Sequence, residues 1–275
     1  MDALRREAWP LVVAIVRRDL TVVLRSRAVL LPIIIVPIVL FVGLPLGLAA
    51  ALRLGGERVG ELAPLLDVLP EHVRRQLGDG PIEQQLLVYL VEFQFASLFL
   101  IVPLMVAAVI AADSFAGEKE RKTLEALLYT PTTDMELYVA KLVGPWVAAT
   151  GVATLGYLLY VISANLIATG DAGRLLAVTP LWLVVILWLT PAVAALGLGA
   201  LVLVSARVRG FQEAYQIGGL IVLPVLLLIV AQFSGVLFLD AAVAIVLGAL
   251  VWLAAAGVLW LGFRSFRRER LLLSA

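Results

Sequence analysis

The sequence predicts an all-α membrane protein that crosses the bilayer six times. Two features of the 275-residue chain carry this prediction. Hydrophobic residues make up 63% of it and charged residues only 15%, whereas soluble domains average about 45–50% apolar and about 25% charged. The chain also contains six apolar stretches, each long enough to cross a hydrocarbon core, which takes ~20 helical residues. This composition excludes both an ordinary soluble globule and a disordered chain.

The six stretches form one transmembrane domain over residues 1–275. The predicted spans cover residues 28–50, 87–112, 142–168, 178–204, 214–238 and 241–263. Proline and glycine inside several spans predict kinks, which neighbouring helices of a bundle can accommodate. The first connection, residues 51–86, is a long outside loop with a helix predicted around Pro70 to Leu77. The second, residues 113–141, is the largest polar segment on the other side of the membrane.

The arm ahead of the first span has its own pattern. Residues 4–24 mix aliphatic side chains with arginines, which is typical of an amphipathic helix lying in the membrane surface. No short apolar core with a small-residue cleavage site precedes the arginines, so the pattern does not predict a cleavable signal peptide.

Basic residues predict the orientation of the chain, because Lys and Arg gather in cytoplasmic loops. Sixteen of the 21 Lys and Arg fall in the N-terminal arm, the second and fourth connections and the C-terminal tail. The other five fall in the outside connections. We therefore expect a multi-pass protein of a bacterial cell (inner) membrane with both termini in the cytoplasm.

Residues 114–142 carry the most specific pattern in the chain. Leu124, Leu127 and Leu128 form one apolar stripe at helical spacing. Opposite charges four residues apart support the same helix, namely Glu118 with Lys122 and Arg121 with Glu125. Pro131 ends this helix, and Thr133 with Glu136 fits a capping box that opens the next one. Pattern alone leaves two interpretations: a helix resting on lipid headgroups, or a lever joined to a span.

The run Glu118-Lys119-Glu120-Arg121-Lys122-Thr123-Leu124-Glu125-Ala126-Leu127-Leu128, followed by Thr130-Pro131, Glu136 and Lys141, resembles the coupling-helix segment of type-2 ABC-transporter permeases. Its place between the second and third of six spans fits that family too. Lys122 departs from the family pattern, which often has glycine there, and this favours helix continuity. Specific residues match over about 25 positions, whereas the topology fits the whole chain.

This resemblance implies a cytoplasmic coupling helix that fits into a cleft of a separate ATP-hydrolysing subunit. Leu124, Leu127 and Leu128 would form the docking face. Ion pairs with the partner would come from Glu118, Arg121 and Glu125, and the implied coupling residues also include Thr123 and Pro131. The implied partners are two copies of an ABC ATP-binding subunit, a second permease copy or a related permease chain, and membrane lipids, with no nucleic acid.

The chain is not expected to be an enzyme, because it lacks a phosphate-binding loop. Gly117 with Lys122 and Thr123 superficially resembles the motif G-x-x-x-x-G-K-[ST], but Arg121 stands where the second glycine belongs. We therefore expect no cofactor on this chain, with ATP and Mg bound by the partner. The absence of cysteine and the single histidine, His72, leave few ligands for a metal site.

Polar side chains are scarce within the predicted spans, and three of them are candidates for lining a pathway. Glu92, Gln94 and Gln232 fall near the outer ends of the second and fifth spans. Intramembrane polar groups mark either such a pathway or hydrogen bonds between helices, and the sequence leaves both open. No carboxylate sits at mid-membrane, which argues against transport driven by an ion gradient.

The function predicted best is the membrane-spanning subunit of an ATP-driven exporter for a lipid-like, drug-like or other substrate, with export favoured by the resemblance alone. Two alternatives remain: a non-transporting membrane scaffold subunit, and an ion-gradient-driven secondary transporter.

Overall fold

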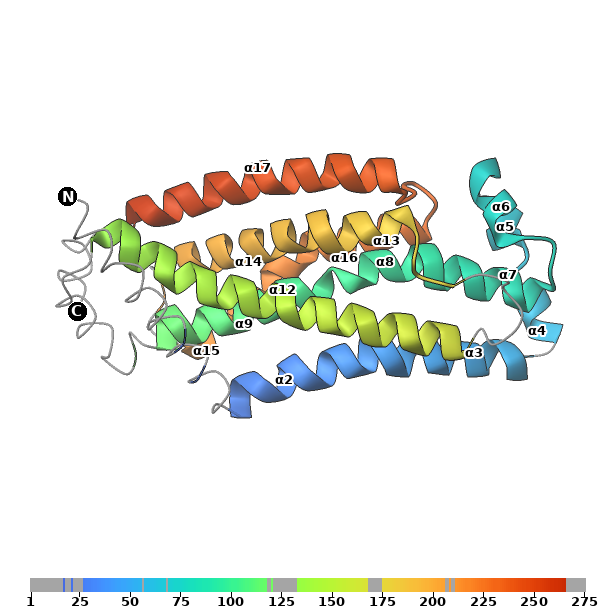
Figure 1. Cartoon of the computed structure of the whole chain (residues 1–275), viewed down its shortest axis with the longest axis horizontal. Helices are drawn as coiled ribbons and strands as arrows, with labels where there is room; N and C mark the ends of the chain where they lie inside the picture. The colour runs from blue at the N-terminus through green and yellow to red at the C-terminus, as the bar shows by residue number, and fades with distance from the viewer. Residues whose placement is uncertain are drawn as a thin grey trace.

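The computed structural model describes residues 27–55, 57–67, 69–117, 133–167, 175–205 and 211–265, and the single positions 17, 21, 120 and 208. Every element in this part of the chain is helical. The long helices run side by side along one axis of an elongated bundle (Figure 1). Six of them are long and apolar enough to cross a membrane, which confirms the all-α, six-span prediction. The surface helix expected over residues 4–24 lies outside the described residues, apart from Arg17 and Thr21.

The first two spans contain several short irregular turns, whereas the third is one uninterrupted helix. Span 1 consists of α2 (Arg27–Ile38), the π-helical turn η1 (Val39–Gly43) and α3 (Leu44–Leu54). Span 2 consists of α7 (Ile82–Tyr89), the π-helical turn η2 (Leu90–Gln94), α8 (Phe95–Phe99), α9 (Ile101–Ala111) and the π-helical turn η3 (Ala112–Gly117). Span 3 is the single helix α12 (Asp134–Ile167).

The last three spans complete the bundle. Span 4 consists of α13 (Pro180–Val184), the π-helical turn η4 (Val185–Leu189) and α14 (Thr190–Ser205). Span 5 consists of α15 (Phe211–Gly218), the 3-10 turn η5 (Gly219–Val222) and α16 (Leu223–Phe233). Span 6 is α17 (Ala241–Ser265).

Three short helices connect spans 1 and 2 at one end of the bundle. They are α4 (Glu57–Gly60), α5 (Pro64–Asp67) and α6 (Glu71–Leu77), and α6 confirms the helix predicted around Pro70 to Leu77. We call this end the loop end (Figure 1). The opposite end holds Gly117 and Thr133, which flank the connection from span 2 to span 3, and we call it the joint end.

The observed spans differ in length from the predicted ones. Span 2 runs from Ile82 to Gly117 and span 3 starts by Met135, so both extend further than the apolar stretches over 87–112 and 142–168. Charged residues ended those predictions, whereas the helices continue through them. Span 5 ends earlier, at Phe233, where a turn includes Gly235 at a φ of 71°, a conformation that glycine adopts without steric cost.

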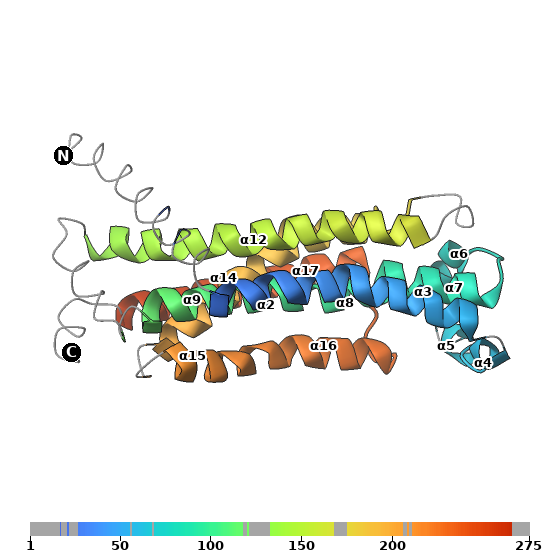
Figure 2. The ribbon, with the colours of Figure 1, turned by 90° about the horizontal axis from the view of Figure 1, so that it is seen from below.

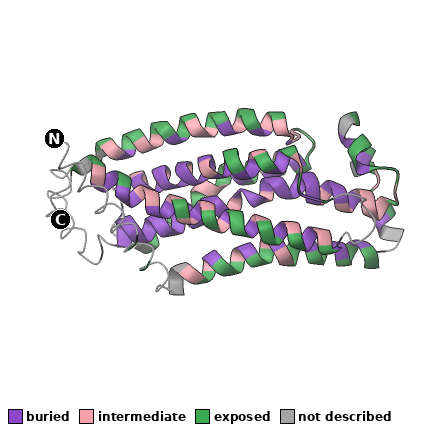
Figure 3. Cartoon of the chain, in the orientation of Figure 1, coloured by how far each residue is buried: buried purple, intermediate pink, exposed green. Residues whose placement is uncertain are grey.

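Span 2 is the central helix of the bundle. Its apolar window is 83% buried and that of span 4 is 67% buried, compared with 17% for span 6. Figure 2 shows α12 and α15–α16 on opposite sides of the central helices, and Figure 3 shows burial concentrated along α9 and α14 while α17 and α2 present exposed faces. The core of the molecule therefore lies between spans 2 and 4.

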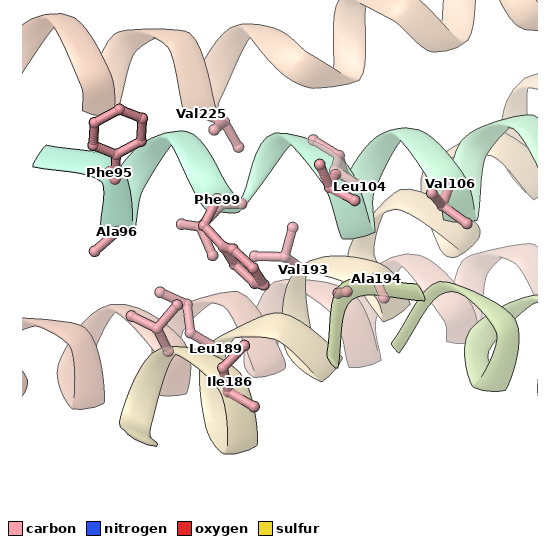
Figure 4. Packing of buried hydrophobic residues seen from close by; sticks show 14 of the residues in the cluster. Phe95, Ala96, Phe99, Leu104, Val106, Ile186, Leu189, Val193, Ala194 and Val225 are labelled. Atoms are coloured by element: carbon pink, nitrogen blue, oxygen red, sulfur yellow. The ribbon is translucent and has the colours of Figure 1, made fainter. Parts of the chain in front are cut away.

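The packing at this core is close. Side chains of α8 and α9 lie between span 4 on one side and Val225 of span 5 on the other (Figure 4). Gly197 of span 4 faces Leu104, and a Cβ added there would lie 2.7 Å from the Leu104 Cδ1. Nearer the loop end, the ring of Trp182 lies 4.8 Å from that of Tyr160 and 5.6 Å from that of Phe99.

Four of the irregular turns are followed by a proline, whereas Pro32, Pro37 and Pro145 lie inside the α-helices α2 and α12 without such a turn. A proline lacks an N–H group, and its ring collides with the carbonyl four residues earlier, so the helix deforms around that carbonyl. Each of the four prolines follows a residue of an interrupted stretch by four positions. The pairs are Phe41 in η1 with Pro45, Phe99 at the end of α8 with Pro103, Leu187 in η4 with Pro191, and Leu220 in η5 with Pro224.

No proline stands at the equivalent distance from η2 or η3, the two π-helical turns of span 2. These turns include the predicted residues Glu92 and Gln94 at the loop end and the buried Asp113 at the joint end. π-helical turns are rare overall, and those that occur often lie at functional sites. We therefore take the residues around η2 and η3 as the candidate site.

Candidate functional site

At the loop end, Glu92 of η2 holds the turn between spans 3 and 4. The side chain is 1% exposed, and its Oε1 accepts a hydrogen bond of 3.0 Å from the backbone N–H of Ala177. Ala177 has a φ of 59°, which is costly for any residue other than glycine. The Tyr157 hydroxyl donates to the carbonyl of the same residue at 2.8 Å. Both backbone groups of the strained residue are therefore bound by side chains from spans 2 and 3.

Two further side chains donate to the carbonyls of η2. Tyr160 of span 3 donates to the Val91 carbonyl at 2.7 Å, and Gln232 of span 5 donates to the Phe93 carbonyl at 2.9 Å. Backbone groups freed inside a membrane must find such partners, since no water is available to bind them. These hydrogen bonds tie the central helix to two of its neighbours.

The structure thus brings the three predicted lining residues, Glu92, Gln94 and Gln232, together around η2. All three are at most 2% exposed within the single chain. Tyr89 donates to the Gln94 Oε1 at 3.3 Å, while the Gln94 Nε2 and the Gln232 Oε1 make no hydrogen bond with the described groups. Glu92 and Gln232 bond to other segments of the chain, whereas Gln94 bonds within span 2, and a role in lining a pathway stays a prediction.

At the joint end, Lys141 ties span 3 to η3. Its side chain is fully buried, and its Nζ donates a hydrogen bond of 3.0 Å to the Ser114 carbonyl. The Nζ also lies 5.6 Å from the centre of the Phe115 ring. Asp113 in the same turn is 5% exposed. Charged and polar groups are therefore buried where span 2 meets the connection to span 3.

A capping box begins span 3 immediately beyond that connection. The Thr133 N–H donates to the Glu136 Oε2 at 2.9 Å, and the Glu136 N–H donates to the Thr133 Oγ1 at 3.2 Å. This reciprocal pair satisfies two of the N–H groups that a helix start leaves without partners. The capping box predicted from the sequence is confirmed.

Comparison with protein families decides the identity of the chain. A family model described as ABC-2 family transporter protein matches residues 13–246, which include spans 1 to 5 and the beginning of span 6. The chain belongs to the ABC-2 transporter family. A search among curated proteins found no match.

The ABC-2 permease is thus a multi-pass membrane protein and the permease subunit of an ABC transporter. Permeases of this family are transport subunits that are not themselves catalytic, and they typically work with an ATP-binding subunit. Within the described residues, no group of three His, Cys, Asp or Glu side chains could hold a metal ion.

The predicted coupling residues of the ABC-2 permease lie outside the described residues. They are Glu118, Arg121, Thr123, Leu124, Glu125, Leu127, Leu128 and Pro131. The structure does describe the two anchors of this segment, Gly117 at the end of span 2 and Thr133 at the start of span 3. Docking of this segment on an ATPase therefore stays a prediction, although the structure describes the residues on either side of the segment.

Sequence reasoning missed the residues that bind freed carbonyls. Ser163 donates to the Phe41 carbonyl at 2.8 Å, and Pro45 could have signalled that this carbonyl is displaced. No comparable signal marks Tyr160, or Lys141, which we counted among the loop charges. Their partners lie in turns of span 2 that the sequence does not announce.

Proposed function

We propose that this ABC-2 permease is the membrane-spanning half of an ATP-driven exporter, powered by an ATP-binding subunit that docks on residues 118–131. One observation supports this most strongly. The segment leaves directly from span 2, the most buried helix of the bundle, and enters span 3 through a capped helix start. A push on this segment is therefore applied to the core of the molecule.

The proposed docking face consists of Leu124, Leu127 and Leu128, with Glu118, Arg121 and Glu125 forming ion pairs around it. Thr123 and Pro131 complete the segment. The apolar stripe would supply most of the affinity, whereas charged pairs at the rim of an interface mainly set orientation and association rate. ATP and Mg would be bound by the docked subunit, present in two copies.

The joint end faces the cytoplasm of a bacterial cell in this proposal. Support comes from the basic residues, which are concentrated in the connections at that end. A second copy of this permease, or a related permease chain, would complete the assembly. Exposed apolar side chains on spans 1, 3, 5 and 6, such as Leu155 and Leu253, would contact lipid or that second chain.

The proposed cargo is lipid-like or drug-like. The described spans offer mainly apolar surface, with Glu92, Gln94 and Gln232 as the nearest polar groups to a pathway at the loop end. Apolar surface with few polar groups suits an amphipathic molecule, since a small hydrophilic solute would need partners for its polar groups.

Leu127→Asp tests the docking proposal, because it places a charge on the proposed apolar face. We expect the ATP-binding subunit to be lost from the purified complex. We also expect ATP-dependent movement of a panel of fluorescent lipids and amphipathic dyes in proteoliposomes to stop. Leu62→Asp is the matched control, since Leu62 is 41% exposed in the outside loop.

The control variant should keep both the partner and the transport. Retention of the ATP-binding subunit by Leu127→Asp would show that residues 118–131 are not the docking site. Transport by that variant driven by an ion gradient without ATP would instead support a secondary transporter.

A further inference from the structure

Lys141 is the most unusual charge in the described part of the chain. Its side chain is entirely buried, and burying an ammonium group costs several kcal/mol unless it is well paired. Helix formation does not demand a cation at this position, because leucine and methionine have a similar helix propensity. The contacts of the ammonium group therefore indicate what it does.

Two of those contacts are with η3, the last described turn of span 2. The Nζ donates to the Ser114 carbonyl at 3.0 Å and lies over the Phe115 ring at 5.6 Å. A cation close to an aromatic ring is attracted by the negative face of the ring. A hydrogen bond from a charged donor is also about twice as strong as a neutral one.

This contact joins the two residues on either side of the proposed docking segment. Ser114 lies three residues before Gly117, the last described residue of span 2, and Lys141 lies in the second turn of α12 beyond Thr133. The hydrogen bond joins residues 27 positions apart, and the whole proposed docking segment lies between them. The contact therefore closes the base of that segment.

We propose that Lys141 is a positioning residue that clamps the end of span 2 to the start of span 3, so that displacement of residues 118–131 moves both spans together. This rests on the proposed function, which places the ATP-binding subunit on that segment. Without the clamp, a push would separate the two helix ends, and the central helix would stay where it is.

A distance measurement across the clamp tests this directly. The chain has no cysteine, so Glu120→Cys with Met135→Cys gives one defined pair of exposed attachment sites for spin labels. Double electron–electron resonance on the full complex with its ATP-binding subunit then reports the distance between the labels at positions 120 and 135. Spectra are recorded without nucleotide and with ATP plus vanadate.

With Lys141 present, we expect one narrow distance distribution that nucleotide leaves unchanged. Lys141→Met keeps the length of the side chain but removes the donor and the charge, and nucleotide should then broaden the distribution and shift it to longer distance. Lys141→Arg should restore the narrow distribution. Arg264→Met, which removes an exposed cation over Trp260 at the same end of the bundle, should leave it narrow.

The variants separate this inference from the proposed function. Loss of thermal stability in Lys141→Met with an unchanged narrow distribution would make Lys141 a purely structural residue and overturn the proposal. If Lys141→Met does not fold, Phe115→Leu weakens the same contact while keeping the hydrogen bond, and should broaden the distribution in part; no broadening would again overturn it. Failure of the ATP-binding subunit to co-purify with unmutated Lys141 would count against the proposed function instead.

Discussion

At the scale of single residues, three side chains act in the same way: the hydroxyl of Tyr160, the amide of Gln232 and the ammonium of Lys141. Each donates to a backbone carbonyl of span 2. Serine and tyrosine side chains do the same at Phe41 and Ala177. In a soluble protein water could bind many of these oxygens, but in a bilayer a side chain must. Several of the buried polar groups of the bundle are thus explained by backbone that departs from the α-helix.

Ala177 offers a test of backbone strain at this scale. It is fully buried at a φ of 59°, which costs an L-residue about 1–2 kcal/mol. Ala177→Gly should be nearly neutral, because relief of the strain offsets the lost methyl group. Ala177→Val should lower the thermal stability in detergent strongly, because a β-branched side chain adds strain and volume. Equal melting temperatures for the two variants would contradict this account.

Glu92 allows its two possible roles to be separated. Glu92→Leu removes the acceptor of the buried Ala177 N–H and should lower the free energy of unfolding by about 1–3 kcal/mol. Glu92→Gln keeps an oxygen for that N–H and should melt close to the parent protein. The reverse pattern, in which Glu92→Leu is fully stable but transport is lost, would favour a direct contact with the cargo.

At the scale of elements, hydropathy and proline positions in the sequence predicted the spans and some of the irregular turns. Apolar stretches located all six spans, and Thr133 with Glu136 located the start of span 3. Pro45, Pro103, Pro191 and Pro224 could be foreseen to disturb their helices. The turns η2 and η3 could not, because no proline follows them at that spacing and their partners come from spans distant in sequence. Helix ends were also misjudged, because Lys141 reads as a loop charge until its burial is seen.

The contact of span 6 with span 4 gives a prediction about one helix. Gly248 of α17 faces Trp188, and a Cβ there would lie 2.4 Å from the indole ring, whereas nothing lies within 4 Å of such an atom at Gly257. Gly248→Ala should therefore destabilise the protein by about 1–3 kcal/mol through overpacking. Gly257→Ala should stabilise it by about 0.5–1 kcal/mol through helix propensity. Thermal unfolding of both variants in one detergent checks the opposite signs.

For the whole molecule, the arrangement around span 2 was beyond the reach of the sequence. Span 4 and span 5 have the same mean hydropathy of 2.3, yet the apolar window of span 4 is 67% buried and that of span 5 is 24% buried. Composition therefore does not tell a central helix from a peripheral one. The side of the membrane on which each end lies is a separate question. The distribution of Lys and Arg predicts that the joint end is cytoplasmic.

Single cysteines at the two ends test that orientation. Asp79 at the loop end and Glu120 at the joint end are both exposed, and the chain has no other cysteine to react. A membrane-impermeant maleimide should label Asp79→Cys in cells whose inner membrane is intact. It should label Glu120→Cys only after that membrane is permeabilised. Labelling in the opposite order would invert the proposed topology.

The central place of span 2 has a consequence for how the protein is made. Span 2 leaves the ribosome before spans 3 and 5, yet the donors that bind its carbonyls sit on those two spans. Until those spans are synthesised, the carbonyls of Val91, Phe93 and Ser114 have none of these partners. The most deeply buried helix of the finished bundle therefore waits for segments translated after it before its freed carbonyls are bound.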